Sequence, residues 1–514
     1  MRYADFGPYN HGRAKPEPMG DLVMDRHANK NQHRPFCLSR RGFLLTTGAL
    51  AGHGLIGCAT TTGRAPLTAP GERPAKACGP ASQYVPKVEA AFVRREGEYG
   101  MRWPGAIYDG ETARAQYATE LAKAAQDLGI ELALRESPIY SLEAGMEWIA
   151  AAESRKADAL LVMLLDRQEH AWPTAKAASD SPVPTIVFSP VGSSFTTNTS
   201  GLAHAPGTVI CSTDDFSQVV SRLNMVRAGA KLRETRFVML KGAERRETSV
   251  AHIGTTLQYL PEKSFLEEYQ NTPTSDEILS IAQYYIDHAQ AVCGPCREDV
   301  INGVKSYAVA RTILERERGD GISMNCLGAL GNSNVSLPCI AWSRMLDQGV
   351  PAACEADVGA CLTHALVLYL FGKPGFQQDP VADTGDKTLI GAHCTCPTRL
   401  DGCNCQPEPF NLSYHHGKRD AVPVPTWRKG QRVSIADIEL RKDAPPRMLI
   451  STGDVVDNVA VPPAGGCVVS VKVRVDDAED MLAFPGFHQI FFYGDHKDDL
   501  AAFCQLHGME ATIV

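Results

Sequence analysis

The segment between residues 110 and 212 alternates helix-patterned stretches with fully apolar ones, and this alternation most strongly limits the folds open to the chain. Residues 112–128 place Ala and Leu at helical spacing before Gly129, and residues 142–154 repeat the pattern. Residues 159–165 are apolar without interruption, as the buried strands of parallel sheets are. Further strands are predicted over residues 104–109, 131–134, 184–188 and 208–211. The pattern predicts an open, parallel α/β domain.

A second unit of the same kind follows, and the texture then changes. Residues 236–241 and 321–326 are predicted strands, and the capping-box residues 274–277 precede a periodic helix. After residue 400, apolar strands at 446–451 and 468–475 are separated by Gly/Pro turns rather than long helices. The expected fold class is therefore α/β, with two Rossmann-like parallel domains followed by a β-rich, barrel-like C-terminal domain.

The N-terminal segment has the features of an export signal. Residues 39–44 read SRRGFL, a twin-arginine signature, and precede an apolar run that ends in a lipobox at Cys58. We expect twin-arginine export to the periplasm or another extracytoplasmic compartment, with a lipid anchor at Cys58. A G-x-G-x-x-G match at residues 52–57 follows no strand and lies inside the signal, so it does not indicate dinucleotide binding. Because this route exports folded proteins, the signal also suggests a metal loaded before export.

The expected domain organisation follows from these patterns and from a Thr/Ala/Gly/Pro-rich stretch after Cys58. It comprises a signal over residues 1–58, a tether over 59–82, an N-terminal α/β domain over 83–230, a second α/β domain over 231–372 and a β-rich domain over 373–514.

Charge and composition exclude two classes of protein. The chain has 51 Lys plus Arg against 59 Asp plus Glu, a net charge of −8, and no dense basic block, which excludes a nucleic-acid partner. Apolar residues make up 44% and charged residues 21%, so most of the chain can bury a core and is not disordered.

Polar groups that suggest chemistry lie in an apolar frame between residues 337 and 393. Glu355 and Asp357 precede the apolar stretch 360–371, and Asp379 and His393 follow it. Burying a carboxylate or an imidazole there is costly unless it is paired or bound to a cation. Each acid alone fits a helix cap or a solvated position equally well, but together they favour a metal site.

These residues carry a resemblance to the L-fucose/L-arabinose isomerase family. The motif Cys354-Glu355-Ala356-Asp357, Asp379 located 24 residues after Glu355, and Gly486-Phe487-His488 resemble that family's metal site. The resemblance implies that Glu355, Asp379 and His488 are metal ligands, with His393 as the further ligand of the arabinose branch.

The resemblance also implies an activity. It predicts Mn²⁺-dependent aldose–ketose isomerisation of a small sugar through an ene-diol, with Glu355 and Asp379 also transferring protons. It further predicts a homo-oligomer with active sites shared between subunits. The N-terminal domain resembles the family only in its alternation of helices and strands and not in any motif. The resemblance therefore does not imply which sugar is the substrate.

Sixteen cysteines need an explanation. Cys293-Gly294-Pro295-Cys296 matches a dithiol motif, but its position between two helices favours a simple turn. The pairs Cys394/Cys396 and Cys403/Cys405 are compatible with zinc, a disulfide or free thiols. Four others are expected to be buried small hydrophobes: Cys326, Cys339, Cys354 and Cys361. His415 and His416 suit a solvated loop, with sugar contact as the alternative.

Three other interpretations remain open. The first is an exported sugar-binding lipoprotein without catalysis, because two α/β domains around a cleft also describe solute receptors. The second is a thiol oxidoreductase that uses Cys293 and Cys296. The third is a relative that keeps the fold and has lost catalysis.

Overall fold

A computed structural model describes residues 68–97, 99, 109–167, 169–415, 419–460, 467–478 and 480–514. The expected export signal, Cys58, most of the predicted strand 104–109, and His416 lie outside the described residues. Within them, no helix combines the length and apolarity needed to cross a membrane.

The first sheet is fully parallel, in the strand order β2-β1-β3-β4-β5. Its strands are β1 (Lys87–Val93), β2 (Glu131–Leu134), β3 (Ala159–Leu164), β4 (Thr185–Ser189) and β5 (Thr208–Ser212). Its helices are α2 (Gly110–Leu128), α3 (Leu142–Ser154), α4 (Ala171–Ser179), the short α5 (Thr196–Thr199) and α6 (Ser217–Glu234). The fully buried β3 confirms the expected parallel arrangement.

Side-chain alternation along these strands assigns the helices to the two faces of the sheet. Phe92 and Leu161 pack on the side covered by α2 and α6, whereas Val93 and Leu160 pack on the side covered by α3 and α4. Strand β1 was not predicted from the sequence. The predicted strand over residues 104–109 lies outside the described residues except for Asp109, which caps the N-terminus of α2.

The second sheet has the order β10-β9-β6-β8-β7, with only the edge strand β7 antiparallel. Its strands are β6 (Arg236–Leu240), β7 (Arg246–Ser249), β8 (Thr256–Leu260), β9 (Gly321–Met324) and β10 (Ala352–Cys354). Its helices are α7 (Lys263–Asn271), α8 (Asp276–His288), α9 (Arg297–Arg316), α10 (Cys326–Leu330), α11 (Cys339–Asp347) and α12 (Val358–Phe371). Helix α12 is apolar on all sides because it lies between this sheet, α6 and the barrel.

The third sheet closes into a six-stranded antiparallel barrel. The ring order is β15-β18-β11-β12-β17-β16, and β15 pairs with β16 to close it. The strands are β11 (Phe376–Asp383), β12 (Thr388–His393), β15 (Arg432–Glu439), β16 (Arg447–Asn458), β17 (Val469–Val475) and β18 (Gln489–Tyr493). The barrel confirms the predicted fold class of two α/β sheets followed by a barrel-like β sheet.

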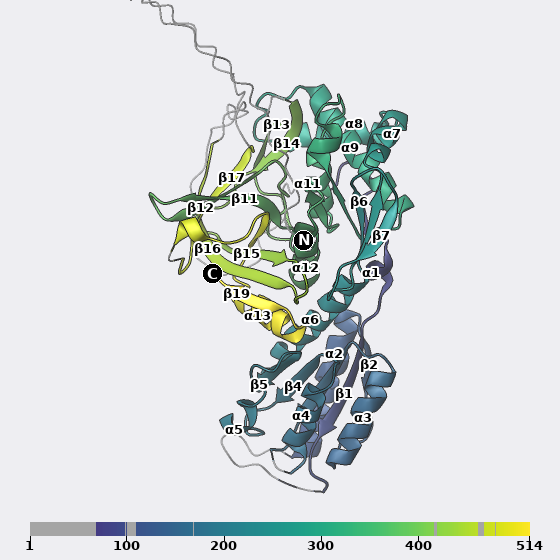
Figure 1. Ribbon diagram of the computed structural model, residues 1–514, viewed down its shortest axis with the longest axis vertical. Coiled ribbons are helices and arrows are strands. Elements are labelled where there is room, and N and C mark those ends of the chain that lie inside the picture. Colours follow the sequence, from purple (N-terminus) through teal and green to yellow (C-terminus); the bar gives the residue numbers. More distant parts are fainter. Residues whose placement is uncertain are drawn as a thin grey trace, which may run out of the picture.

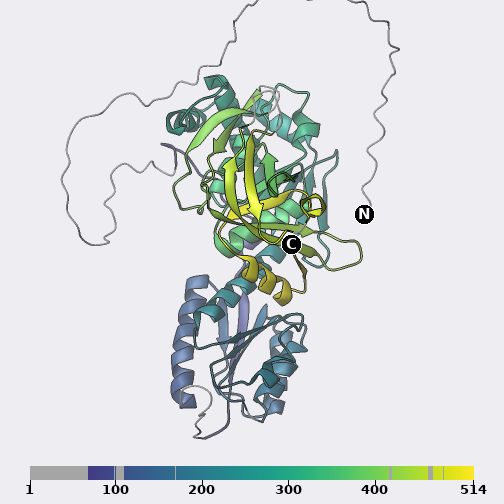
Figure 2. The same cartoon turned by 90° about the vertical axis from the view of Figure 1, so that its left-hand side faces the viewer.

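Five smaller elements complete the barrel half of the molecule. The ribbon β13 (Phe410–His415) and β14 (Arg419–Pro425) packs on α9 and α11. The short η1 (Met481–Ala483) precedes β18, and α13 (Lys497–Leu506) follows it. The last strand, β19 (Glu510–Ile513), adds to β16 in parallel. The first sheet and its helices form one lobe, and the other two sheets lie together in a second (Figure 1 and Figure 2).

The described part of the expected tether lies against the second sheet's helices. Glu72 is fully buried and accepts hydrogen bonds from Arg344 Nε at 2.6 Å and Gln348 Nε2 at 2.8 Å. The backbone amide of Ala75 donates to Tyr307 Oη at 3.0 Å, and α1 (Pro80–Gln83) follows. Residues 68–83 are therefore held by specific contacts, which a Thr/Ala/Gly/Pro-rich composition does not reveal.

Candidate functional site

The four residues predicted as metal ligands come from elements that meet at one end of the barrel. Glu355 directly follows β10, His393 ends β12, Asp379 lies within β11, and His488 immediately precedes β18. Strand β11 pairs with both β12 and β18, and this register places Asp379 opposite Ala392. The barrel thus brings together side chains that are more than a hundred residues apart in sequence.

The ligand atoms of three of these residues converge. Glu355, His393 and His488 each place a nitrogen or carboxylate oxygen within 4.8 Å of the others. His488 Nε2 lies 3.6 Å from Glu355 Oε2, and His393 Nε2 lies 3.9 Å from Glu355 Oε1. Asp379 lies beside this group, with Oδ1 3.2 Å from His488 Nε2. The Glu355 side chain is 40% exposed, so the group is accessible from solvent.

Two atoms in this group have unmet bonding capacity. His488 Nε2 and Asp379 Oδ1 are both buried and form an ion pair at 3.2 Å, but neither atom has a partner in hydrogen-bond geometry. Buried polar atoms almost always have a partner. An imidazole nitrogen and a carboxylate oxygen that approach each other without a hydrogen bond are suited to binding one cation. The donor set of carboxylates and imidazoles therefore fits a divalent metal ion such as Mn²⁺.

Asp357 orients His488 from behind. Its Oδ2 lies 3.1 Å from His488 Nδ1, while its Oδ1 accepts a hydrogen bond from Ala360 N at 2.8 Å and so caps α12. A carboxylate on the second ring nitrogen is the usual support of a metal-binding histidine. The sequence analysis treated Asp357 only as part of a motif. Its signal was the Glu-x-Asp spacing directly before a helix.

Electrostatics at His488 follow from these carboxylates. Burial lowers the pKa of His488, but the carboxylates of Asp357, Asp379 and Glu355 outweigh it and raise the pKa to about 10. A cation in this position thus relieves the repulsion among three acids. Asp437 lies close by, and burial together with the Asp357 charge raises its pKa to about 7.

The backbone at the site is strained. Glu355, Ala356 and His488 have φ angles of 62°, 53° and 53°, in the left-handed region that non-glycine residues seldom occupy. Asp437 Oδ2 accepts a hydrogen bond from Phe487 N at 3.3 Å and holds the turn before β18. Strain retained at two converging ligands is a feature of functional sites.

His364 is a second residue that the sequence analysis missed. It lies on α12, is 1% exposed, and neither ring nitrogen has a hydrogen-bond partner. Burial, as the main cause, and the charge of the nearby His393 together lower the pKa of His364 to about 3, so the ring is neutral. An apolar helix with one embedded histidine carried no signal that distinguished it from a core residue.

The remaining predictions concern the cysteines, and their outcomes differ. Cys293 and Cys296 lie between the end of α8 and the start of α9, which confirms a helix–helix turn. Among the described residues, neither Cys396 nor Cys403 belongs to a group with metal-ligand geometry. Cys394 belongs to two such groups, one with Cys339 and His415 and the other with Cys354 and His393.

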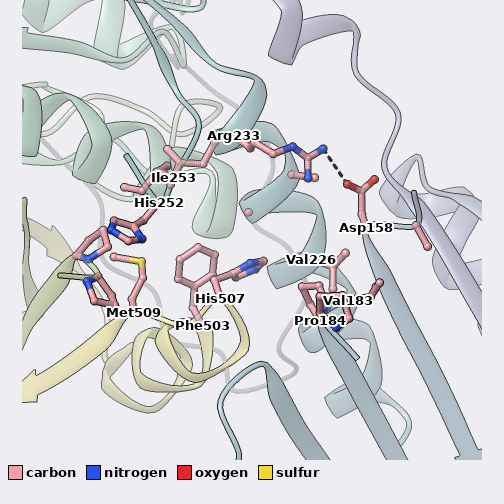
Figure 3. A pocket seen from close by; sticks show the side chains of 18 residues that line it. Asp158, Val183, Pro184, Val226, Arg233, His252, Ile253, Phe503, His507 and Met509 are labelled. Carbon is pink, nitrogen blue, oxygen red and sulfur yellow. Dashed lines mark ion pairs between the residues drawn. The ribbon is translucent and has the colours of Figure 1, made fainter. Parts of the chain in front are cut away.

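One cavity of the molecule lies away from the candidate metal site. It encloses about 480 Å³ between α6, α13 and the start of β4, and none of the four predicted ligands lines it. Figure 3 shows its wall, where Arg233 and Asp158 pair with each other at 2.8 Å while His507 and Phe503 face the cavity from α13.

Comparisons with known proteins support a distant relation to a sugar isomerase. No family profile matches the chain. It is 23% identical over 280 residues to sulfoquinovose isomerase of Clostridium sp. (strain MSTE9), an alignment that covers 49% of this chain. The chain spans 60% of the length of that relative.

One solved structure is also similar over a large share of its own length. It is an ABC transporter solute-binding protein from Burkholderia multivorans, with 13% identity, 55% coverage of this chain, 93% coverage of that chain and a TM-score of 0.17. At that TM-score the likeness carries no argument about the fold or the function. The chain is thus distantly similar to a sugar isomerase.

Proposed function

We propose that the protein is a metal-dependent sugar isomerase that interconverts an aldose and a ketose through an ene-diol. The observation that carries the proposal is the buried ion pair of His488 Nε2 and Asp379 Oδ1, in which neither atom has a hydrogen bond, next to the exposed carboxylate of Glu355. The distant similarity to sulfoquinovose isomerase supports the reaction class.

Glu355, Asp379, His488 and His393 would hold the metal, for which Mn²⁺ best suits the mixed oxygen and nitrogen donors. A bound divalent cation supplies Lewis-acid stabilisation of the negative charge that develops on the sugar oxygens.

The chain's own residues supply the proton transfers. Glu355 is exposed at the mouth of the site, so its carboxylate can reach a sugar C–H from solvent. Asp379, whose Oδ1 faces the same His488 Nε2 as the Glu355 carboxylate does, is positioned to return the proton. His488 is fixed by Asp357 and positions both carboxylates rather than moving a proton itself.

The first experiment combines metal analysis with turnover. The wild-type protein and its Glu355→Gln and His488→Ala variants are analysed for bound metal after loading with Mn²⁺. The same samples are incubated with a panel of aldoses that includes sulfoquinovose, in deuterated water. We expect one manganese ion and deuterium incorporation at C1 of the ketose product for the wild type, and loss of both in the two variants. Glu439→Gln, in the same barrel but outside the site, is the matched control.

Two results contradict the proposal. The first is full turnover by Glu355→Gln. The second is tight sugar binding by the wild type without turnover or deuterium incorporation, which would instead favour an exported sugar-binding lipoprotein.

We further propose that the mature protein is exported by the twin-arginine route, lipid-anchored at Cys58 and assembled as a homo-oligomer. Metabolic labelling with a radioactive fatty acid tests the anchor, because wild-type protein should be labelled and Cys58→Ala should not. Light scattering of protein that starts at residue 68 tests the assembly. A monomeric mass there would contradict the proposed oligomer.

A further inference from the structure

Three buried cysteines and a histidine gather directly behind the Glu355–His488 site. Cys339, Cys394 and His415 place their sulfur and ring-nitrogen atoms within 4.8 Å of one another. Cys354, His393 and Cys394 form a second group with the same spacing, so the two groups share Cys394. All are at least nine-tenths buried: Cys339, Cys354, Cys394, His393 and His415.

Each of these residues comes from a different element. Cys339 begins α11, Cys354 ends β10, Cys394 follows β12, and His415 ends β13. The group therefore joins the second α/β sheet, the barrel and the β13–β14 ribbon. Separate elements rarely converge on sulfur atoms unless those atoms share a role.

Two clusters of side chains are connected through adjacent residues. The thiol group is the cluster of Cys339, Cys354, Cys394 and His415, and the carboxylate group is the cluster of Glu355, Asp379, His393 and His488. Cys354 and Glu355 are neighbours in sequence, as are His393 and Cys394, and each pair contributes one member to either group. His393 faces both, with Nδ1 3.5 Å from Cys394 Sγ and Nε2 3.9 Å from Glu355 Oε1.

Burial alone does not explain the gathering. A free cysteine often packs as a small hydrophobe, and Cys211, Cys361 and Cys504 do so here, because among the described residues none of them belongs to a ligand-like group. A disulfide would join only two of the three sulfurs and would leave the third outside the pair. Three sulfurs and an imidazole form the donor set of a soft, tetrahedral metal site.

We propose that Cys339, Cys354, Cys394 and His415 bind a second metal ion, a thiolate-preferring cation such as Zn²⁺, separate from the ion of the carboxylate group. Binding deprotonates the three thiols and releases three protons to solvent, and His415 binds as the neutral imidazole. Zinc–sulfur bonds of about 2.3 Å bring sulfurs to roughly 3.8 Å apart. Binding of the ion therefore requires Cys354 to join the group of Cys339, Cys394 and His415, with which it already shares Cys394 as a neighbour.

The site is structural rather than catalytic, because four protein ligands fill a tetrahedral ion and the group is buried. Its consequence is positional. The ion fixes Cys354 and Cys394, and so fixes the adjacent Glu355 and His393, in the strained geometry of the carboxylate group. His393 Nδ1–H can donate to the Cys394 thiolate, which leaves Nε2 free to face Glu355.

Cobalt is the direct probe. Reduced, metal-free protein is titrated with Co²⁺ and followed for the thiolate-to-cobalt charge-transfer band, and zinc-loaded protein is assayed for metal per chain. We expect the band in the wild type and in Glu355→Gln. Cys339→Ser and Cys354→Ser should lose the band and should also bind one zinc ion per chain fewer than the wild type. Cys504→Ser, a buried thiol outside the group, should keep the band. Glu355→Gln changes the carboxylate group and leaves the cysteines intact. An absent cobalt–thiolate band would therefore contradict the second metal site alone, whereas full turnover by Glu355→Gln would contradict the proposed isomerase activity alone.

A measurement on the unsubstituted protein covers the case in which the serine variants do not fold. Folded, zinc-loaded wild-type protein is titrated with p-mercuribenzoate, which binds thiolates, in the presence of a chromogenic zinc indicator. Release of one zinc per chain as the thiols react supports the proposal. The proposal is overturned if no cobalt–thiolate band appears, if the thiols react without releasing zinc, or if the natively isolated protein contains a disulfide between two of these cysteines.

Discussion

His488 Nδ1 lies 3.1 Å from Asp357 Oδ2, while the opposite ring nitrogen faces Asp379 Oδ1 at 3.2 Å. The ring is thus held between an orienting carboxylate and a candidate metal-binding one. Asp357→Asn should weaken Mn²⁺ binding by about 10- to 100-fold, the usual effect of losing such a support. Asparagine caps a helix as well as aspartate does, so the fold should be preserved. Isothermal titration calorimetry measures the affinity.

The control for that prediction is Asp386→Asn, a carboxylate on the barrel surface that pairs with Lys472 at 3.0 Å and lies away from the site. It should bind manganese like the wild type. Equal affinity in Asp357→Asn and the wild type would show that His488 needs no orienting carboxylate.

Glu355 should lower the free energy of unfolding although turnover requires it, because its φ of 62° strains the backbone. Glu355→Gly should raise the free energy of unfolding by about 1 kcal/mol, since glycine adopts left-handed conformations without penalty. Turnover should be abolished. Glu355→Gln keeps the strain and should lose turnover without that gain, which separates backbone relief from removal of a charge. Urea unfolding measures the difference between the two variants.

Lys156 provides the matched position for this comparison. It is exposed, has a φ of 56° and lies in the turn after α3. Lys156→Gly should gain a similar stability and keep full turnover. If Glu355→Gly were less stable than Glu355→Gln, the strain argument would be wrong.

The sequence predicted the elements whose patterns are local and long. Helices α2 and α3 and strand β3 have an unambiguous period, and the structure has them close to their predicted bounds. Strand β1 was missed because Lys87 and Glu89 interrupt an alanine-rich stretch with weak strand propensity. The three-residue β10 is too short to show any period.

The candidate site was predictable only in part. Glu355, Asp379, His393 and His488 were recognisable by family resemblance, and the structure places them together, although their role as ligands remains a prediction. The gathering of Cys339, Cys394 and His415 was not recognisable, because it depends on how the barrel packs on α11 rather than on a spacing. For the same reason Cys339 and Cys354 were expected to be ordinary core residues.

The buried pair Glu72–Arg344 should contribute strongly to stability. Both side chains are almost fully buried, and Gln348 Nε2 also donates to Glu72. Glu72→Ala leaves the Arg344 charge buried without a carboxylate and should cost about 3–5 kcal/mol of unfolding free energy. Arg73→Ala removes an exposed ion pair with Glu315 and should cost at most about 1 kcal/mol. Equal losses in the two variants, measured by urea unfolding, would show that residues 68–75 contribute little to the folded state.

His507 should make stability depend on pH in the acid range. Burial lowers its pKa to about 4, although the hydrogen bond between Nε2 and Met225 O opposes the shift. In the unfolded chain a histidine takes up its proton near pH 6.5. Between about pH 6.5 and 4 the unfolded state therefore binds a proton that the folded state does not. The contribution of His507 to stability is complete above pH 6.5 and is lost as the pH falls through this window.

His507→Gln isolates this effect, because glutamine can still donate a hydrogen bond to Met225 O but does not titrate. The difference in unfolding free energy between the wild type and His507→Gln should be constant above pH 7. It should shift in favour of the variant as the pH falls from about 6.5 to 4, because protonation of His507 in the unfolded chain lowers the unfolding free energy of the wild type only. Urea unfolding at a series of pH values measures it. Parallel curves for the two proteins across this range would mean that His507 titrates in the folded protein as it does in the unfolded chain.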